Sequence, residues 1–147
     1  MKKVAFLTIG DPSVYATYHY IHRFVEQQGK KAEMISGVPS FCSAAVRLGI
    51  SLGEGEEQIH IIPGSYGVEE TTVLSGTRIY MKSGRELQHV KKVLKEEAAY
   101  REKNGEELQV YAVTDCGLEN EMVMRGLEEW PEKLPYLTIV IVKVRKI

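Results

Sequence analysis

Residues 4–12 read VAFLTIGDP, a mostly apolar run that leads directly into a polar turn. The run is too short for a signal peptide or a membrane span, and it has the composition of a buried strand. Asp11 is a residue type that caps helices, and Pro12 suits the first helical position, where a missing N–H costs nothing. We therefore predict a buried strand over residues 4–9 and a helix that begins at Pro12.

The pattern continues as strand and helix beyond this stretch. Gly29 stands where a left-handed helix end is expected, residues 32–35 read as a second strand, and residues 41–48 read as a helix ended by Gly49. The first helix has apolar residues at helical spacing, namely Val14, Tyr18, Ile21 and Val25.

The segment 51–57 is polar and rich in glycine, which is typical of a linker. We place a domain boundary there, between residues 1–52 and 53–147. The second part contains one long amphipathic helix, 86–103, closed by Asn104-Gly105. Its expected strands are residues 59–62, 78–81, 108–113 and 136–144. Strands that alternate with helices predict an α/β fold in which much of the sheet is parallel.

The first part has only two expected strands, fewer than a doubly wound domain normally uses. Residues 4–9 are apolar on both faces, as an interior strand would be, so this strand needs neighbours on both sides. We expect that the first domain is incomplete and that sequence N-terminal to Met1 belongs to it. Catalysis by the 147 residues alone is therefore not expected, and an exposed strand edge would favour association.

Composition narrows the class of ligand. The chain is 44% hydrophobic and 27% charged, with a net charge of −1, so it should fold but lacks the positive field that nucleic-acid binding needs. Cys42 and Cys116 have no partners at metal-ligand spacing, and His19 and His22 lack a third ligand nearby. We expect a cytoplasmic protein with a small polar ligand, no metal and no membrane or nucleic-acid partner.

The turn after residue 9 is the first candidate site, because ligands of open α/β sheets bind at the carboxyl ends of strands. The Asp11 carboxylate would repel phosphate and attract ribose hydroxyls or an ammonium group, which favours a nucleoside. The alternative is that Asp11 only caps its helix. A second turn, residues 37–41, could face the same crevice with its amides and the Ser40 hydroxyl, or Ser40 could simply be a helix cap.

Two further strand ends could bind a ligand. Met81 could pack on an adenine ring, and Gly117 would allow close approach to the backbone; a core methionine and a simple turn are the alternatives. Lys82 and Arg85 could bind a polycarboxylate, or could belong to a solvated helix face.

Read in order, these segments resemble the tetrapyrrole methylase family. Residues 9–12, IGDP, correspond to its GDP motif, residues 36–52 to its turn and helix, and Ile79-Tyr80-Met81 to its strand end. Residues 37–45, GVPSFCSAA, and 135–143 are similar to family members that methylate C20 of precorrin-2 or cobalt-precorrin-2. Ser36 and Ser51 stand where the family commonly has proline.

The resemblance implies two α/β domains with a ligand crevice between them and methyl transfer from S-adenosylmethionine to C20 of the tetrapyrrole, on the route to cobalamin. It also implies a homodimer, and Lys82 and Arg85 as candidates to bind the substrate. The residues implied for S-adenosylmethionine are Ile9, Gly10, Asp11, Val14, Pro39, Ser40, Phe41, Met81 and Gly117. The alternatives are a uroporphyrinogen methylase, a diphthine synthase, or a catalytically silent fragment that binds S-adenosylmethionine.

Overall fold

The structure, a computed structural model, describes residues 3–64, 66–83 and 86–147. By its internal contacts the chain divides into two units, Met1–Ser43 and Ala44–Ile147, and each is described by itself. The first unit contains helix α1 (Tyr18–Gln27) and the first turn of helix α2 (Ser40–Leu48), which continues into the second unit.

Both strands predicted for the first unit are wrong. Residues 4–9 and 32–35 have no regular secondary structure, and Val4 and Ile9 are 93% and 83% exposed. A strand exists only where its backbone groups pair with a neighbouring strand. Within the described part of the first unit no segment supplies that pairing, so an apolar pattern alone does not produce a strand.

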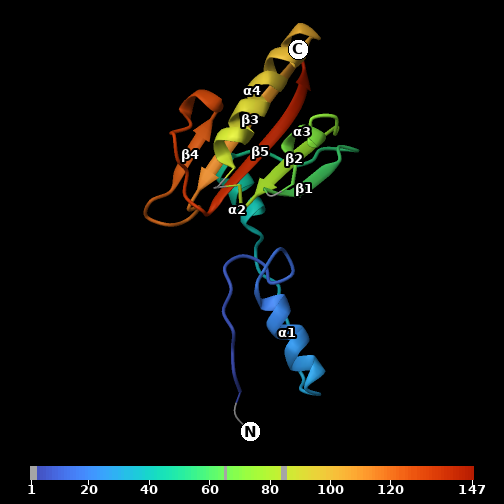
Figure 1. The fold of residues 1–147 in the computed structure, drawn as a ribbon, viewed down its shortest axis with the longest axis vertical. Coiled ribbons are helices and arrows are strands. Elements are labelled where there is room, and N and C mark those ends of the chain that lie inside the picture. The colour runs from blue at the N-terminus through green and yellow to red at the C-terminus, as the bar shows by residue number, and fades with distance from the viewer. Residues whose placement is uncertain (1–2, 65, 84–85) are drawn as a thin grey trace. The chain divides into compact units, whose positions relative to one another are not determined.

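The start of the first helix is also later than predicted. It begins at Tyr18 rather than Pro12, and its cap residue, Thr17, makes no side-chain capping bond. Asp11 instead accepts a hydrogen bond from the amide of Ser13, which forms a tight turn that competes with a helix. Figure 1 shows the loop that this leaves before α1. The predicted helix ends are confirmed, because Gly29 follows the end of α1 and Gly49 follows α2.

The second unit is built on a five-stranded sheet in the order β1-β2-β5-β3-β4. All four predicted strands of this part are confirmed. The strands are β1 (Ile59–Pro63), β2 (Thr77–Met81), β3 (Glu106–Thr114), β4 (Met122–Arg125) and β5 (Thr138–Lys146). The short edge strand β4 was not predicted, because four residues are too few for an alternating pattern to stand out.

The expectation of a largely parallel sheet is wrong. Only β1 and β2 pair in parallel, whereas β5 runs antiparallel to both of its neighbours, β2 and β3. Helix α4 (Leu87–Lys103) does carry the chain from β2 to a strand of the same direction, β3. The later chain returns without a helical crossover, through β4 and the short 3₁₀ helix η1 (Leu127–Glu129), and β5 then inserts between β2 and β3.

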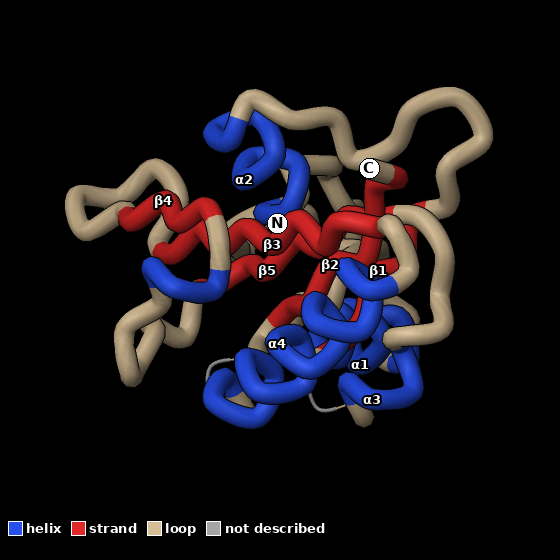
Figure 2. Tube along the Cα trace, turned by 90° about the horizontal axis from the view of Figure 1, so that it is seen from above, coloured by secondary structure: helices blue, strands red, loops and turns tan. Residues whose placement is uncertain are grey.

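Helices cover both faces of this sheet. Figure 2 shows α4 and the short helix α3 (Val68–Thr71) on one face and α2 on the other. Strand β2 is buried at all five of its positions, as expected for a strand covered on both sides. The core on the α4 face includes Tyr80, Val90, Leu94, Val140 and Val142, all fully buried. Strands β1, β2 and β3 run in the same direction, so their carboxyl ends lie at the same end of the sheet.

Candidate functional site

The Asp11 carboxylate joins two turns of the first unit. Its Oδ1 accepts hydrogen bonds from the Ser13 hydroxyl and, at 2.8 Å, from the Ser13 amide. Its Oδ2 accepts a hydrogen bond of 2.9 Å from the amide of Gly37, 26 residues further along the chain. The Ser13 hydroxyl, followed by the two amides, lowers the pKa of Asp11 below its usual 3.8. The side chain is therefore an anion at neutral pH.

The same two turns pack backbone against backbone. Gly10 has a φ of +83°, a conformation that favours glycine, and a Cβ there would lie 3.7 Å from the carbonyl oxygen of Val38 and 3.8 Å from the amide of Ser40. A Cβ at Gly37 would lie only 2.2 Å from the carbonyl oxygen of Gly10. Residue 37 therefore cannot carry a side chain unless the two turns separate.

Helix α2 begins at this paired turn. The amides of Cys42 and Ser43 donate to the Pro39 carbonyl, whereas those of Ser40 and Phe41 have no such acceptor among the described residues. The structure thus brings together four of the predicted cofactor residues: Gly10, Asp11, Pro39 and Ser40. The other predicted cofactor residues of this unit are Ile9, Val14 and Phe41, which lie close to these four in the sequence. Ile9 is exposed, Phe41 is buried, and the Val14 amide donates to the Asp11 carbonyl.

The second unit gathers its own predicted residues at the carboxyl ends of β2 and β3. The register places Met81 opposite Ile139 of β5, which in turn lies opposite Val113 of β3. Met81 is the last residue of β2 and is 8% exposed. Just beyond these ends, Lys82 and Asp115 have φ values of +59° and +46°, which cost energy for residues with a side chain. Such strained residues cluster at functional sites.

The turn that contains Gly117 is held by a residue that the sequence did not single out. The Glu121 carboxylate accepts a hydrogen bond of 2.7 Å from the Gly117 amide and pairs with the guanidinium of Arg47 on α2. The Gly117 amide, and secondly Arg47, lower the pKa of Glu121. Arg47 and Glu121 are 74 residues apart, so no local pattern could have predicted this contact.

The predicted substrate residues are Lys82 and Arg85, of which the structure describes Lys82. Lys82 is exposed at the end of β2, and Arg85 lies outside the described residues. Within the described part of the chain, no three His, Cys, Asp or Glu side chains form a group that could hold a metal ion. In that same part, no helix combines the length and apolar character needed to cross a membrane.

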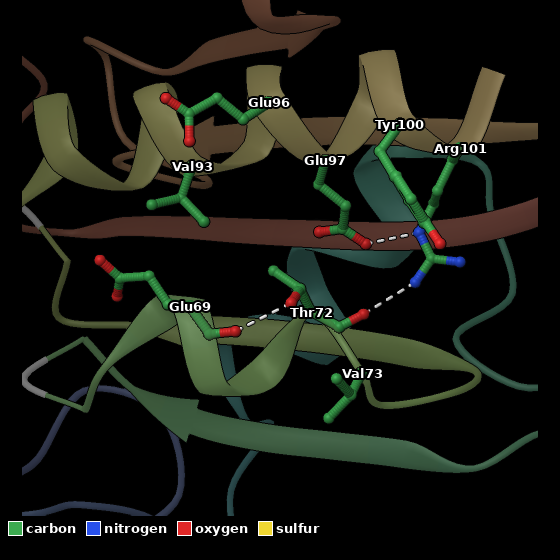
Figure 3. A pocket seen from close by; sticks show the side chains of 8 residues that line it. All are labelled: Glu69, Thr72, Val73, Val93, Glu96, Glu97, Tyr100 and Arg101. Carbon is green, nitrogen blue, oxygen red and sulfur yellow. Dashed lines mark hydrogen bonds and ion pairs between the residues drawn. The ribbon is translucent and has the colours of Figure 1, made fainter. Parts of the chain in front are cut away.

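An open groove of about 600 Å³ lies between α3 and α4 (Figure 3). Its basic residue, Arg101, already donates to Glu97, Glu106 and the carbonyl of Thr72. Glu97 is in turn paired with Arg78, which is fully buried in β2. These polar groups bind one another and fasten α4 to the sheet, so we assign the groove a structural role.

The sequence model of the Tetrapyrrole (Corrin/Porphyrin) Methylases matches residues 1–130. The chain belongs to the tetrapyrrole methylase family. A probable cobalt-precorrin-2 C(20)-methyltransferase of Methanocaldococcus jannaschii is 31% identical over 144 residues, which cover 96% of this chain and 59% of that protein. This chain thus spans about three fifths of the length of that relative.

Solved structures of tetrapyrrole methylases share the fold. A cobalt precorrin-4 methyltransferase of cobalamin biosynthesis superposes with a TM-score of 0.73 at 14% identity, covering 91% of this chain and 61% of that one. A uroporphyrin-III C-methyltransferase of Thermus thermophilus, complexed with S-adenosylhomocysteine, gives a TM-score of 0.63 at 17% identity, covering 91% and 62%. At these identities the similarity shows a shared fold. The S-adenosylhomocysteine was bound to the Thermus protein.

Proposed function

We propose that this chain is the S-adenosylmethionine-binding part of a methyltransferase that acts on C20 of precorrin-2 or cobalt-precorrin-2 in cobalamin biosynthesis. The observation that carries the proposal is the paired turn of Gly10-Asp11 with residues 37–40, since it brings four of the nine predicted cofactor residues together from two distant segments. The C20 specificity is supported by the 31% identical relative from Methanocaldococcus jannaschii.

The paired turn fits the chemistry of S-adenosylmethionine. The cofactor has an ammonium group, a cationic sulfonium and ribose hydroxyls, all of which favour an anionic neighbour such as Asp11. Its carboxylate would suit the first amides of α2, those of Ser40 and Phe41, where the helix dipole is positive. For the second unit, Met81 and Gly117 are proposed as cofactor residues on the family resemblance alone.

In the proposed reaction C20 of the reduced tetrapyrrole attacks the methyl group. A carbon–carbon bond would form as the sulfur–methyl bond breaks, the bonding electrons would stay on sulfur to leave S-adenosylhomocysteine, and the C20 proton would pass to solvent. The cofactor supplies an electrophilic methyl group, so no protein nucleophile is needed. The residues of the chain would act by holding the reactants in line, which is the proximity and orientation contribution to catalysis.

The acidic side chains of the tetrapyrrole require cationic partners. Lys82 is proposed as one of them, because it is exposed directly after the β2 strand end that carries Met81. Arg85 is proposed as a second on its charge and position in the sequence alone. Substitution of either residue should raise KM for the tetrapyrrole more than KM for S-adenosylmethionine.

Titration calorimetry with S-adenosylhomocysteine tests the proposal. The chain should bind this product in the micromolar to millimolar range, with one site per chain. Absence of binding at millimolar ligand, by a chain whose circular dichroism shows it to be folded, would refute the cofactor assignment.

Mass spectrometry of reaction mixtures tests the rest. The chain, and a version extended with the parts of the Methanocaldococcus relative that lie outside the match, are incubated with S-adenosylmethionine and cobalt-precorrin-2. NMR of the purified product then locates the added methyl group: a methyl group at C20 supports the proposal, and one at another position would assign a different family activity. Binding without turnover in either version would identify a catalytically silent binding module.

A further inference from the structure

Both oxygens of the Asp11 carboxylate are already engaged within the protein. Oδ1 has two donors from Ser13, and Oδ2 has the amide of Gly37 at 2.9 Å. A carboxylate has about four lone-pair positions, so three of them are used before any ligand binds. A group that served mainly as a ligand for S-adenosylmethionine would be expected to keep more of its acceptor capacity free.

Gly37, whose amide donates to Asp11, also packs tightly against the backbone of Gly10. The position of a Cβ on Gly37 is 2.2 Å from the Gly10 carbonyl oxygen, and Gly10 directly precedes Asp11. One hydrogen bond and one van der Waals contact therefore hold the same two turns together. Ser40, at the start of α2, follows this junction by three residues.

We infer, on the basis of the proposed function, that Asp11 is a positioning residue whose carboxylate clamps the turn at Gly37 to the turn at Gly10. The clamp sets the spacing between the Gly10 backbone and the first amides of α2. Its loss lets the turns separate, so that no ligand contact of Asp11 itself is needed for the affinity to fall.

A double-mutant cycle separates the clamp from direct ligand contact. Asp11→Ala removes both side-chain oxygens, and with them the acceptors of the Ser13 and Gly37 amides. Gly37→Ala keeps the carboxylate but pushes the turns apart. If Asp11 acts through the turn, each variant should lower the affinity for S-adenosylhomocysteine about tenfold, and the double variant should also lose about tenfold. Losses that multiply to about a hundredfold would overturn the inference.

A second measurement protects the test against a variant that fails to fold. Hydrogen exchange at the Gly37 amide should be at least tenfold faster in Asp11→Ala than in the wild type, because alanine removes the oxygen that accepts from that amide. An unchanged exchange rate together with weakened ligand binding would show direct ligand contact and overturn the clamp. Glu33→Ala is the matched control in the same unit: its side chain is 74% exposed and pairs with the exposed Lys31, so the change should leave both measurements unchanged.

The two proposals fail in different ways. If the wild-type chain binds no S-adenosylhomocysteine, the proposed function fails while the exchange of the Gly37 amide still reports on the clamp. If the wild type binds and the cycle is additive, the proposed function stands and the clamp is overturned.

Discussion

Replacement of Glu97 by glutamine should strongly destabilise the second unit. The Arg78 side chain is fully buried in β2 and donates to both Glu97 oxygens, at 3.0 Å and 2.8 Å. The guanidinium also donates to the carbonyl of Thr71 at 3.1 Å. Glutamine has nearly the same shape, but it removes the negative charge and turns an NH₂ group toward the guanidinium. A cation would then be buried without a counter-charge.

The magnitude follows from the desolvation of that cation. Breaking a buried ion pair by removing one partner typically costs about 3–5 kcal/mol. Domains of this size have a total free energy of unfolding of about 5–15 kcal/mol. For a unit of about 100 residues, each kcal/mol shifts Tm by about 4 °C, so the expected fall in Tm is about 12 °C or more. The loss also reaches the proposed site, because β2 carries Met81 at its end.

Thermal unfolding followed by circular dichroism measures this effect. Glu96→Gln is the matched control, since Glu96 is the exposed neighbour on the same helix and should change the free energy of unfolding by less than about 0.5 kcal/mol. The double variant Arg78→Met with Glu97→Leu should recover most of the lost stability, because an apolar pair can replace a buried ion pair. A Tm for Glu97→Gln within about 2 °C of the wild type would refute the reasoning.

Two further predictions follow from close contacts. Gly64→Ala should lower the free energy of unfolding by about 1–3 kcal/mol, since its Cβ would lie 2.5 Å from the Cα of Ser83. Gly67→Ala is the control, because the nearest atom to its Cβ is 3.7 Å away in the flexible side chain of Glu70. Equal stability of the two variants would count against this packing. Hydrogen bonds from Ser13 and Gly37 lower the pKa of Asp11 in the folded state, so its contribution to stability is present above the unfolded pKa and is lost as pH falls through the folded one. The NMR signals of the Asp11 carboxyl carbon and the Gly37 amide should therefore titrate together with a midpoint below 3.8, and a midpoint at or above that value would contradict the contact.

Local patterns in the sequence determined the features that depend on neighbouring residues. The ends of α1 and α2 were predictable because Gly29 and Gly49 adopt the left-handed conformation that terminates a helix. The strands of the second unit were predictable because their apolar runs are long and bounded by turn residues. The order of the IGDP motif, the turn after it and the strand end at Met81 was sufficient to indicate the family.

Tertiary structure alone decided the features that depend on distant segments. Residues 4–9 have the composition of a strand, yet a strand requires a partner, and pairing is not encoded in the run itself. The sheet is mostly antiparallel because β5 inserts between β2 and β3, a choice made by packing and not by the alternation of strands and helices. The bond from Asp11 to Gly37 likewise spans 26 residues. The sequence shows which chemical groups each residue carries and which local patterns they form. The fold determines which groups meet, because hydrogen bonds and close packing act over a few ångströms in space regardless of separation along the chain.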